Sequence, residues 1–278
     1  MDGVPIDAEA EALEARVAAG LRDARSACVA VSGGVDSSLV LALAARTLGA
    51  DAVVAVTAVA PVMLPGEGEA ARGLAAALGV AHVEVAVPLM DEPRYVANPR
   101  QRCYVCKGMV LDAVGGVAAE RGCETVLDGA NLDDLGDERP GIRAAAERGV
   151  RHPLLEAGLG KREVRRLARA LELTVCDAPS QACLASRIPY GERITVEKLD
   201  RIADAERTLR GLGFGRCRVR AHGDVARIEV PLEDVERAAG ADRAALARRL
   251  RALGFTYVTL DLDGLRTGSM NEASDVVA

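Results

Sequence analysis

The sequence carries Ser32-Gly33-Gly34-Val35-Asp36-Ser37-Ser38 between an apolar run at 28–31 and a second apolar stretch at 39–44. This order predicts a short strand that enters a glycine-rich turn and is followed by a helix. Gly33 and Gly34 lack Cβ atoms, so the backbone can approach an anion closely, and a helix N-terminus presents unpaired amides to it. The stretch therefore predicts a pyrophosphate-binding loop.

The polar side chains of this loop add to the prediction. Ser32, Ser37 and Ser38 offer hydroxyl donors, and Asp36 can hold Mg²⁺ against the phosphates. The order S-G-G-x-D-S resembles the signature of the PP-loop ATP pyrophosphatases, which split ATP into AMP and pyrophosphate, and it lacks the Gly-Lys-Ser/Thr of a Walker loop. The alternative is a chance Gly-Gly turn in which Asp36 or Ser37 merely caps a helix.

The amino-acid composition argues against nucleic acids and membranes as binding partners. The 278 residues carry a net charge of −6 and only 2% aromatic residues, which argues against a broad nucleic-acid surface and against base-stacking platforms. No apolar stretch approaches the roughly 20 residues that a membrane span needs, and residues 1–25 predict an amphipathic helix instead of a signal peptide. We therefore expect a cytoplasmic protein with no membrane partner. Its seven cysteines, an odd number, suggest thiols or metal ligands.

Strand and helix patterns alternate after the loop. Strands are predicted at 52–58, 82–87 and 125–128, and helices at 67–78, 106–121 and 161–173. This alternation predicts an α/β fold with a parallel sheet covered by helices on both faces. Because ligands of such sheets bind outside the carboxyl ends of the strands, we expect Asp128 and Asn131 to lie near the phosphate turn and to contact the nucleotide.

The second half of the chain changes in character. Residues 177–193 have no sustained period and contain two prolines and a glycine, which is typical of a functional loop or a domain junction. A helix at 195–212, strands at 217–222 and 226–230, a helical region at 232–253 and a strand at 256–262 follow. We predict a PP-loop domain at 1–176, a junction at 177–193 and a small α+β domain at 194–278.

Three cysteines stand out by position. Cys103 and Cys106 lie at a predicted helix start, where the helix dipole favours the thiolate, and Cys183 lies in the irregular loop. Three thiolates can hold three irons of a 4Fe-4S cluster and leave the fourth iron open. The alternatives for a lone C-x-x-C are half a zinc site, a redox pair or two ordinary thiols. Cys28 and Cys217 are predicted to be small core residues, and Cys123 and Cys176 receive no role.

Several runs together resemble the LarE family of ATP-dependent sacrificial sulfur transferases, over nearly the whole chain. They are residues 32–38, 102–107 (RCYVCK), 128–134 (DGANLDD), 182–191 (ACLASRIPYG) and 218–230 (RVRAHGDVARIEV). The resemblance implies that ATP adenylates a carboxylate of pyridinium-3,5-biscarboxylic acid mononucleotide, which sulfur then converts to a thiocarboxylate on the route to the nickel-pincer nucleotide of lactate racemase. The resemblance also implies a homo-oligomer, since members of the family form hexamers.

Members of this family obtain sulfur in two ways. In some, a single cysteine matching Cys183 gives up its own sulfur and is left as dehydroalanine. In others, cysteines matching Cys103, Cys106 and Cys183 hold a cluster that delivers an attached sulfide. Because this chain has all three cysteines, the resemblance favours the cluster and repeated turnover.

Charged residues of the second half are further candidates. Arg187 can hold a phosphate or the adenylate, although a plain salt bridge is the alternative. The resemblance suggests that Arg218 and Arg220 bind the phosphate of the nucleotide substrate, with solvated edge-strand charges as the alternative. Glu206 matches a family carboxylate near substrate and metal, whereas a glutamate on a helix surface is common.

Two rival functions fit parts of the sequence. A tRNA-thiolating PP-loop enzyme also pairs this loop with a C-x-x-C and a distant third cysteine, but the acidic balance and the scarcity of aromatics argue against it. A non-catalytic nucleotide or metal sensor would retain ATP binding alone. Pyrophosphate release that depends on the acceptor carboxylate separates an enzyme from such a sensor.

Overall fold

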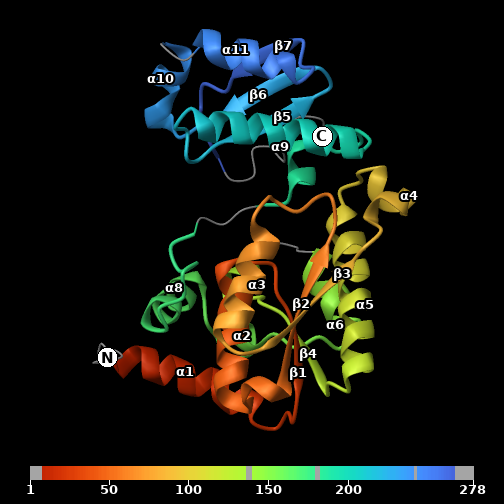
Figure 1. Ribbon diagram of the computed structural model, residues 1–278, viewed down its shortest axis with the longest axis vertical. Helices are drawn as coiled ribbons and strands as arrows, with labels where there is room; N and C mark the ends of the chain where they lie inside the picture. The colour runs from red at the N-terminus through yellow and green to blue at the C-terminus, as the bar shows by residue number, and fades with distance from the viewer. Residues whose placement is uncertain (1–7, 136–139, 179–181, 241–242, 267–278) are drawn as a thin grey trace. The chain divides into compact units, whose positions relative to one another are not determined.

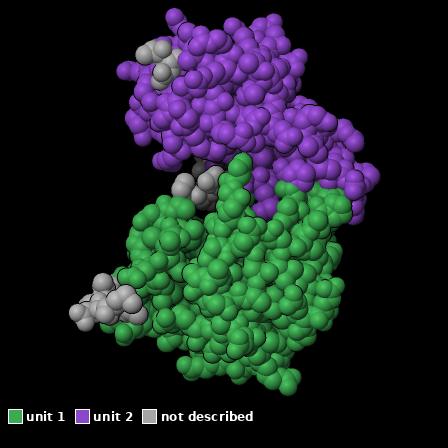
Figure 2. Space-filling model, in the orientation of Figure 1, with its two compact units in different colours: residues 1–60, 65–89, 101–181 green, residues 61–64, 90–100, 182–278 purple. Residues whose placement is uncertain are grey.

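The computed structural model describes residues 8–135, 140–178, 182–240 and 243–266. The chain forms two compact units, coloured separately in Figure 2. Unit 1 comprises residues 1–60, 65–89 and 101–181, and unit 2 comprises residues 61–64, 90–100 and 182–278. Within the described ranges, no helix is both long enough and apolar enough to cross a membrane.

Unit 1 is built on a four-stranded parallel sheet (Figure 1). Its strands are β1 (Ala27–Ala30), β2 (Val53–Val59), β3 (Ala81–Ala86) and β4 (Thr125–Leu127), in the order β3-β2-β1-β4. Residues of β1 are almost fully buried, as expected for a central strand of a parallel sheet. The predicted α/β fold with a parallel sheet is confirmed. Because β1 and β4 are neighbours, the loops after them leave the same edge of the sheet.

Helices cover both faces of this sheet. One face packs against α1 (Ala8–Leu21), α2 (Val35–Leu48), α3 (Glu67–Ala77) and α8 (Lys161–Ala170) in the largest apolar core. The other face packs against α5 (Arg102–Arg121), which in turn contacts α6 (Pro140–Ala146). The sequence predicted the long helices, whereas α6 and the single-turn α7 (Pro153–Glu156) were not predicted. Their shortness leaves too few turns for a recognisable helical period.

Unit 2 contains a small mixed sheet in the order β5-β6-β7. Its strands are β5 (Arg218–His222), β6 (Val225–Glu229) and β7 (Tyr257–Leu260), with β5 antiparallel and β7 parallel to β6. Helix α9 (Val196–Gly211) packs against β5 and α11 (Arg243–Ala252) against β7, with the short α10 (Val235–Ala239) between them in the chain. Phe214 and Phe255, the two phenylalanines of the chain, are buried. The predicted α-β-β-α-β order is confirmed.

Residues 61–64 and 90–100 belong to unit 2, where they bind the backbone of residues 184–192. The Leu184 amide donates to the Val62 carbonyl at 2.9 Å. Asn98, which follows α4 (Pro93–Val96), is fully buried, and its side-chain amide donates to the carbonyls of Ile188, Pro189 and Glu192 at 2.7–3.3 Å. No sequence pattern marks 61–64 or 90–100 as part of the second unit, since the partners lie about 90 or more residues away.

Candidate functional site

The glycine-rich loop lies between β1 and α2, at the edge of the sheet where β1 ends. The Ser37 hydroxyl accepts from the Ser32 amide at 3.1 Å and donates to the Gly34 carbonyl at 3.2 Å, so it closes the turn from within. Gly33 has φ +80°, and a Cβ there would lie 2.6 Å from the Glu67 carbonyl oxygen. Only glycine fits this position. The turn leads into α2, whose first backbone amides have no partner within the helix.

Asp36 lies in the first turn of α2 and is paired with one cation and one side-chain amide. Its carboxylate accepts from the Lys161 ammonium at the start of α8 and from the Asn131 side-chain amide at 3.2 Å. About a quarter of the Asp36 side chain stays exposed. A partly exposed carboxylate next to a phosphate-type loop fits the hard oxygen ligands that Mg²⁺ prefers. Lys161 was not predicted as a site residue, because it is 125 residues away in sequence.

Asp128 follows β4 and is buried among donors. His152 Nδ1 lies 2.5 Å from its Oδ1, and Lys107 Nζ lies 2.7 Å from its Oδ2. Burial alone would raise the pKa of Asp128, but the hydrogen bonds and charges of His152 and Lys107 outweigh it and hold the pKa well below its usual range. Asp128 therefore stays ionised and is held in place by its two partners. The other ring nitrogen of His152, Nε2, is buried and has no hydrogen-bond partner among the described residues.

The loops after β1 and β4 touch each other. A Cβ on Gly129 would lie 2.6 Å from the Ser37 backbone nitrogen, so the β4 loop lies directly against the first turn of α2. Asn131 is also buried and reaches Asp36 from the same loop. The structure thus brings the predicted Asp36, Asp128 and Asn131 to one edge of the sheet. Two lysines that the sequence analysis missed, Lys107 and Lys161, neutralise the two carboxylates there.

The C-x-x-C pair lies in the first turn of α5, which begins at Arg102. Cys103 is exposed and Cys106 is partly exposed, and a spacing of three residues puts them on one side of the helix. The next residue, Lys107, contacts Asp128. These exposures fit two ligands of a metal cluster.

The third cysteine, Cys183, belongs to unit 2, where it caps the short 3-10 turn Leu184–Arg187. Within the described part of the chain, no group of three or more His, Cys, Asp or Glu side chains is arranged to hold a metal ion. The shared cluster of Cys103, Cys106 and Cys183 stays a prediction.

Three of the other four cysteines are poor nucleophiles because their thiol pKa values are raised. Cys28 and Cys217 are buried, as predicted for core residues, and burial raises their thiol pKa values to about 12 and about 11. Burial also raises the pKa of Cys123. Cys176 Sγ lies 3.6 Å from its neighbour Asp177. A raised thiol pKa leaves little thiolate at neutral pH, so Cys28, Cys217 and Cys123 are unsuited to metal binding or attack.

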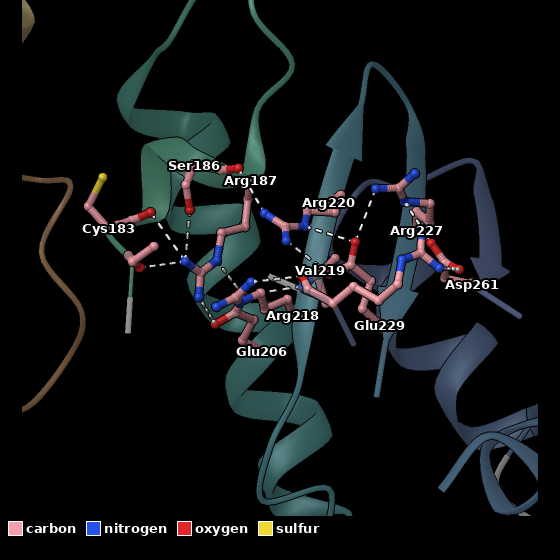
Figure 3. A network of polar contacts seen from close by, with 12 residues as sticks. Cys183, Ser186, Arg187, Glu206, Arg218, Val219, Arg220, Arg227, Glu229 and Asp261 are labelled. Carbon is pink, nitrogen blue, oxygen red and sulfur yellow. Dashed lines mark hydrogen bonds and ion pairs between the residues drawn. The ribbon is translucent and has the colours of Figure 1, made fainter. Parts of the chain in front are cut away.

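A network of charged side chains extends from residues 182–187 into unit 2, with Cys183 at one end of it (Figure 3). Arg187 is 2% exposed, and its Nε and Nη2 donate to the two oxygens of Glu206 on α9 at 2.8 and 3.2 Å. Its Nη1 donates to the carbonyls of Ala182 and Cys183 and to the Ser186 hydroxyl. All three guanidinium nitrogens of Arg187 thus have protein partners. The salt bridge that was predicted as the alternative role of Arg187 is present, with Glu206 as its partner.

Glu206 is equally enclosed. Besides Arg187, its carboxylate accepts from Arg210 Nη2 at 3.0 Å and from the Val219 amide at 3.2 Å. With a side chain only 1% exposed, it serves the fold of unit 2 through these bonds. The suggested role of Glu206 near a substrate and a metal stays a prediction.

The two arginines of β5 differ from one another. Arg220 is 3% exposed, binds both oxygens of buried Glu229 at 3.1 and 2.9 Å, and donates to the Ser186 carbonyl at 2.9 Å. Arg218 forms no ion pair with any described carboxylate and is partly exposed. Burial, together with the positive charges of Arg220 and Arg187, lowers the pKa of Arg218, and the carboxylates of Glu229 and Glu206 oppose this shift in part. Arg218 Nη1 lies 3.5 Å from the Arg266 carbonyl oxygen, and no described carboxylate pairs with its guanidinium. A partly exposed guanidinium without a carboxylate partner can bind an anion.

Comparison with known proteins agrees with this geometry. Residues 9–94, which contain the glycine-rich loop, match the family model described as asparagine synthase, a family of ATP-using PP-loop enzymes. The chain is 47% identical over 246 residues to the uncharacterized protein slr1717 of Synechocystis, covering 88% of this chain and 91% of that protein. It is 28% identical over 174 residues to the uncharacterized protein MJ0830 of Methanocaldococcus jannaschii, covering 63% and 68%.

A third relative has a named activity. The chain is 38% identical over 260 residues to the pyridinium-3,5-bisthiocarboxylic acid mononucleotide synthase of Lactiplantibacillus plantarum, covering 93% of this chain and 94% of that protein. The match spans both units, from the phosphate-type loop to the buried charges of the second sheet. This protein therefore belongs to the LarE family of ATP-dependent PP-loop enzymes.

Proposed function

We propose that the protein adenylates a carboxylate of pyridinium-3,5-biscarboxylic acid mononucleotide with ATP and converts it to a thiocarboxylate. The observation that carries the proposal is the match over 93% of the chain to a synthase whose name states this class of product. The loop at the start of α2, with its required glycine and the adjacent Asp36–Lys161 pair, supports the ATP half of the reaction.

Adenylation solves a chemical problem of the substrate. A carboxylate resists nucleophiles, and its acyl adenylate has AMP as a good leaving group, so one difficult displacement becomes two easier ones. In the first step a substrate carboxylate oxygen attacks the α-phosphorus and pyrophosphate leaves. In the second, sulfur attacks the acyl carbon, and AMP leaves with that oxygen. We assign pyrophosphate to Ser32, Gly33, Gly34, Ser37, Ser38 and the amides of the α2 N-terminus, with Mg²⁺ on Asp36.

Two lysines of unit 1 add positive charge at this site. Lys161 is 30% exposed and Lys107 is 32% exposed, and each neutralises a carboxylate at the edge where the β1 and β4 loops meet. An ammonium group held there by a carboxylate can turn to a phosphate oxygen without bringing a new charge into the site. Asp128 and Asn131 then act by fixing Lys107 and Asp36 in place.

We assign sulfur delivery to Cys103, Cys106 and Cys183. A 4Fe-4S cluster on three thiolates would supply a sulfide from its fourth iron, which no cysteine ligates. The position of exposed Cys103 and partly exposed Cys106 in one helix turn supports this assignment. The alternative source is the sulfur atom of Cys183 itself, which would limit each chain to a single turnover.

Arg218 is the stronger of the two β5 candidates for the phosphate of the nucleotide substrate. Replacing Arg218 with alanine is expected to raise KM for this substrate about tenfold or more, because a charge-assisted bond to phosphate is worth roughly 1.5–3 kcal/mol. Steady-state kinetics at saturating ATP measure the change. Arg216→Ala removes an exposed arginine two residues earlier and serves as the control. Equal effects of the two variants would contradict the assignment.

Anaerobic turnover tests the proposed function as a whole. Protein purified without oxygen is incubated with ATP, Mg²⁺ and the dicarboxylate nucleotide, and pyrophosphate and thiocarboxylate are quantified with bound iron and sulfide. We expect pyrophosphate release that depends on the nucleotide, and more than one thiocarboxylate per chain when a sulfide source is present. Pyrophosphate release without any acceptor dependence would contradict the proposal.

The same experiment separates the sulfur sources and the tRNA alternative. Loss of the elements of hydrogen sulfide from Cys183 in the mass spectrum, with one product per chain, would replace the cluster by a sacrificial cysteine. A tRNA acceptor would show itself by binding that weakens steeply with added salt.

A further inference from the structure

We infer that Arg187 is a positioning residue for Cys183: its buried guanidinium fixes the turn from which the Cys183 sulfur is presented. The inference rests on the proposed function only in taking Cys183 as the residue that handles sulfur. Arg187 acts through the backbone, because Figure 3 shows the Cys183 sulfur on the opposite side of its residue from the guanidinium.

One planar group connects the turn to the helix behind it. On one side, Nε and Nη2 of Arg187 bind the two oxygens of Glu206, a residue of α9. On the other side, Nη1 donates to the Ala182 carbonyl, to the Cys183 carbonyl at 3.2 Å and to Ser186 Oγ at 3.0 Å. Because the guanidinium is rigid and planar, the positions of the Ala182 and Cys183 carbonyls are set relative to α9.

Further bonds hold the other parts of the same turn. The Ser186 carbonyl accepts from Arg220 Nη1 at 2.9 Å, and Arg220 is itself fixed by Glu229. The Leu184 amide donates to the Val62 carbonyl. The Cys183 backbone is therefore bound on both flanks, although it lies in a segment that has no helix period or strand pairing of its own.

Stability alone is a weak reason for such an arrangement. A pair of apolar side chains of similar volume would stabilise the buried space between the turn and α9 as well as a desolvated ion pair does. An apolar pair would, however, leave the Ala182 and Cys183 carbonyls without these donors, and the turn would lose its fixed geometry. The feature that requires arginine is the second branch of the guanidinium, which binds the backbone at the cysteine.

Arg187→Lys tests this role, since lysine keeps the charge beside Glu206 but has one nitrogen and cannot bind both sides. Cys183 is only partly exposed, so a freed turn exposes its sulfur more often. We expect the alkylation rate of Cys183 in the metal-free protein, resolved by mass spectrometry, to rise about fivefold, the factor of one lost hydrogen bond. Cys103 and Cys106 in unit 1 provide internal references.

Kinetics provide the second readout. We expect kcat for thiocarboxylate formation to fall about tenfold or more in Arg187→Lys, because small misplacements of a reacting group are costly, while KM for ATP stays unchanged. Arg210→Ala is the matched control: it breaks the other ion pair of Glu206, on an exposed side chain that does not touch the turn. We expect this control to leave both the alkylation rate and kcat near wild type.

Three outcomes decide the inference. An alkylation rate in Arg187→Lys equal to that in Arg210→Ala would overturn it. If Arg187→Lys shows no cooperative thermal unfolding, Ser186→Ala takes its place, because it removes one acceptor of the Arg187 guanidinium. We then expect a smaller rise in the alkylation rate of Cys183. No rise would overturn the inference. A raised rate in protein that forms no thiocarboxylate in any variant would support the positioning role and contradict the proposed function instead.

Discussion

Cys183→Ser is expected to reduce thiocarboxylate formation by about a thousandfold or more, while nucleotide-dependent pyrophosphate release continues. A serine oxygen neither carries sulfur nor ligates a cluster iron as a thiolate does, so the second half-reaction loses its donor. The glycine-rich loop, Asp36 and Lys161 lie in unit 1 and are untouched by the change. Quenched-flow assays of pyrophosphate and thiocarboxylate on the same samples separate the two halves.

Cys176→Ser is the control for this prediction. Cys176 is also partly exposed, and its sulfur contacts only Asp177 among the hydrogen bonds of the described residues, so its loss removes a thiol of similar exposure. We expect this variant to form thiocarboxylate at the wild-type rate. Product formation by Cys183→Ser at a rate near that of Cys176→Ser would exclude Cys183 from sulfur transfer under either sulfur source.

Gly129→Ala is expected to weaken ATP binding about tenfold or more without unfolding the protein. The new Cβ would lie 2.6 Å from the Ser37 nitrogen and 2.9 Å from the Asp36 carbonyl carbon, and both are backbone atoms that cannot swing aside. The β4 loop and the first turn of α2 must therefore move apart, which displaces the amides that face the pyrophosphate. Calorimetric titration with a non-hydrolysable ATP analogue measures the loss.

Gly116→Ala provides the comparison. Gly116 lies in the exposed part of α5, and a Cβ there meets no atom within 4 Å. Alanine in a helix interior is better than glycine by roughly 0.5–1 kcal/mol, so this variant should melt slightly higher and bind the ATP analogue as the wild type does. If Gly129→Ala bound the analogue as tightly as Gly116→Ala, the loop contact would have no part in nucleotide binding.

The sequence was sufficient for the parts of the site that are local. Ser32 to Ser38 follow one strand and open one helix, and Asp128 follows the neighbouring strand, so alternation and the position of strand ends place them at one edge of the sheet. The start of α5 at the C-x-x-C pair is local in the same sense. Short-range pattern and a simple topological rule predict such features without knowledge of side-chain contacts.

Partners distant in sequence were not predictable in this way. Lys161 reaches Asp36 across 125 residues, and His152, the residue before the single-turn α7, reaches Asp128 across 24 residues. A lysine at a helix start or a single histidine is common, and nothing in its neighbours indicates a carboxylate partner. The one available signal was Lys107, which directly follows Cys106 in a run already assigned to function.

Arg187 shows the same limit within a conspicuous motif. From the sequence it could bind a phosphate or a carboxylate, since a guanidinium matches both. The choice depends on whether a buried acid lies opposite, and Glu206 is 19 residues away on the next helix. Helical periodicity places Glu206 on the buried side of α9. Burial alone does not indicate which cationic side chain pairs with it.

Segments 61–64 and 90–100 belong to unit 2, which limits where the chain can be cut or recombined in protein engineering. A fragment that begins at residue 182 lacks Val62 and Asn98, whose bonds hold the backbone at Leu184 and at 188–192. A chimaera that exchanges the C-terminal half between relatives would combine a cysteine loop from one parent with its anchors from the other. Recombination boundaries for this family should therefore be chosen by spatial unit, with three exchanged pieces instead of one.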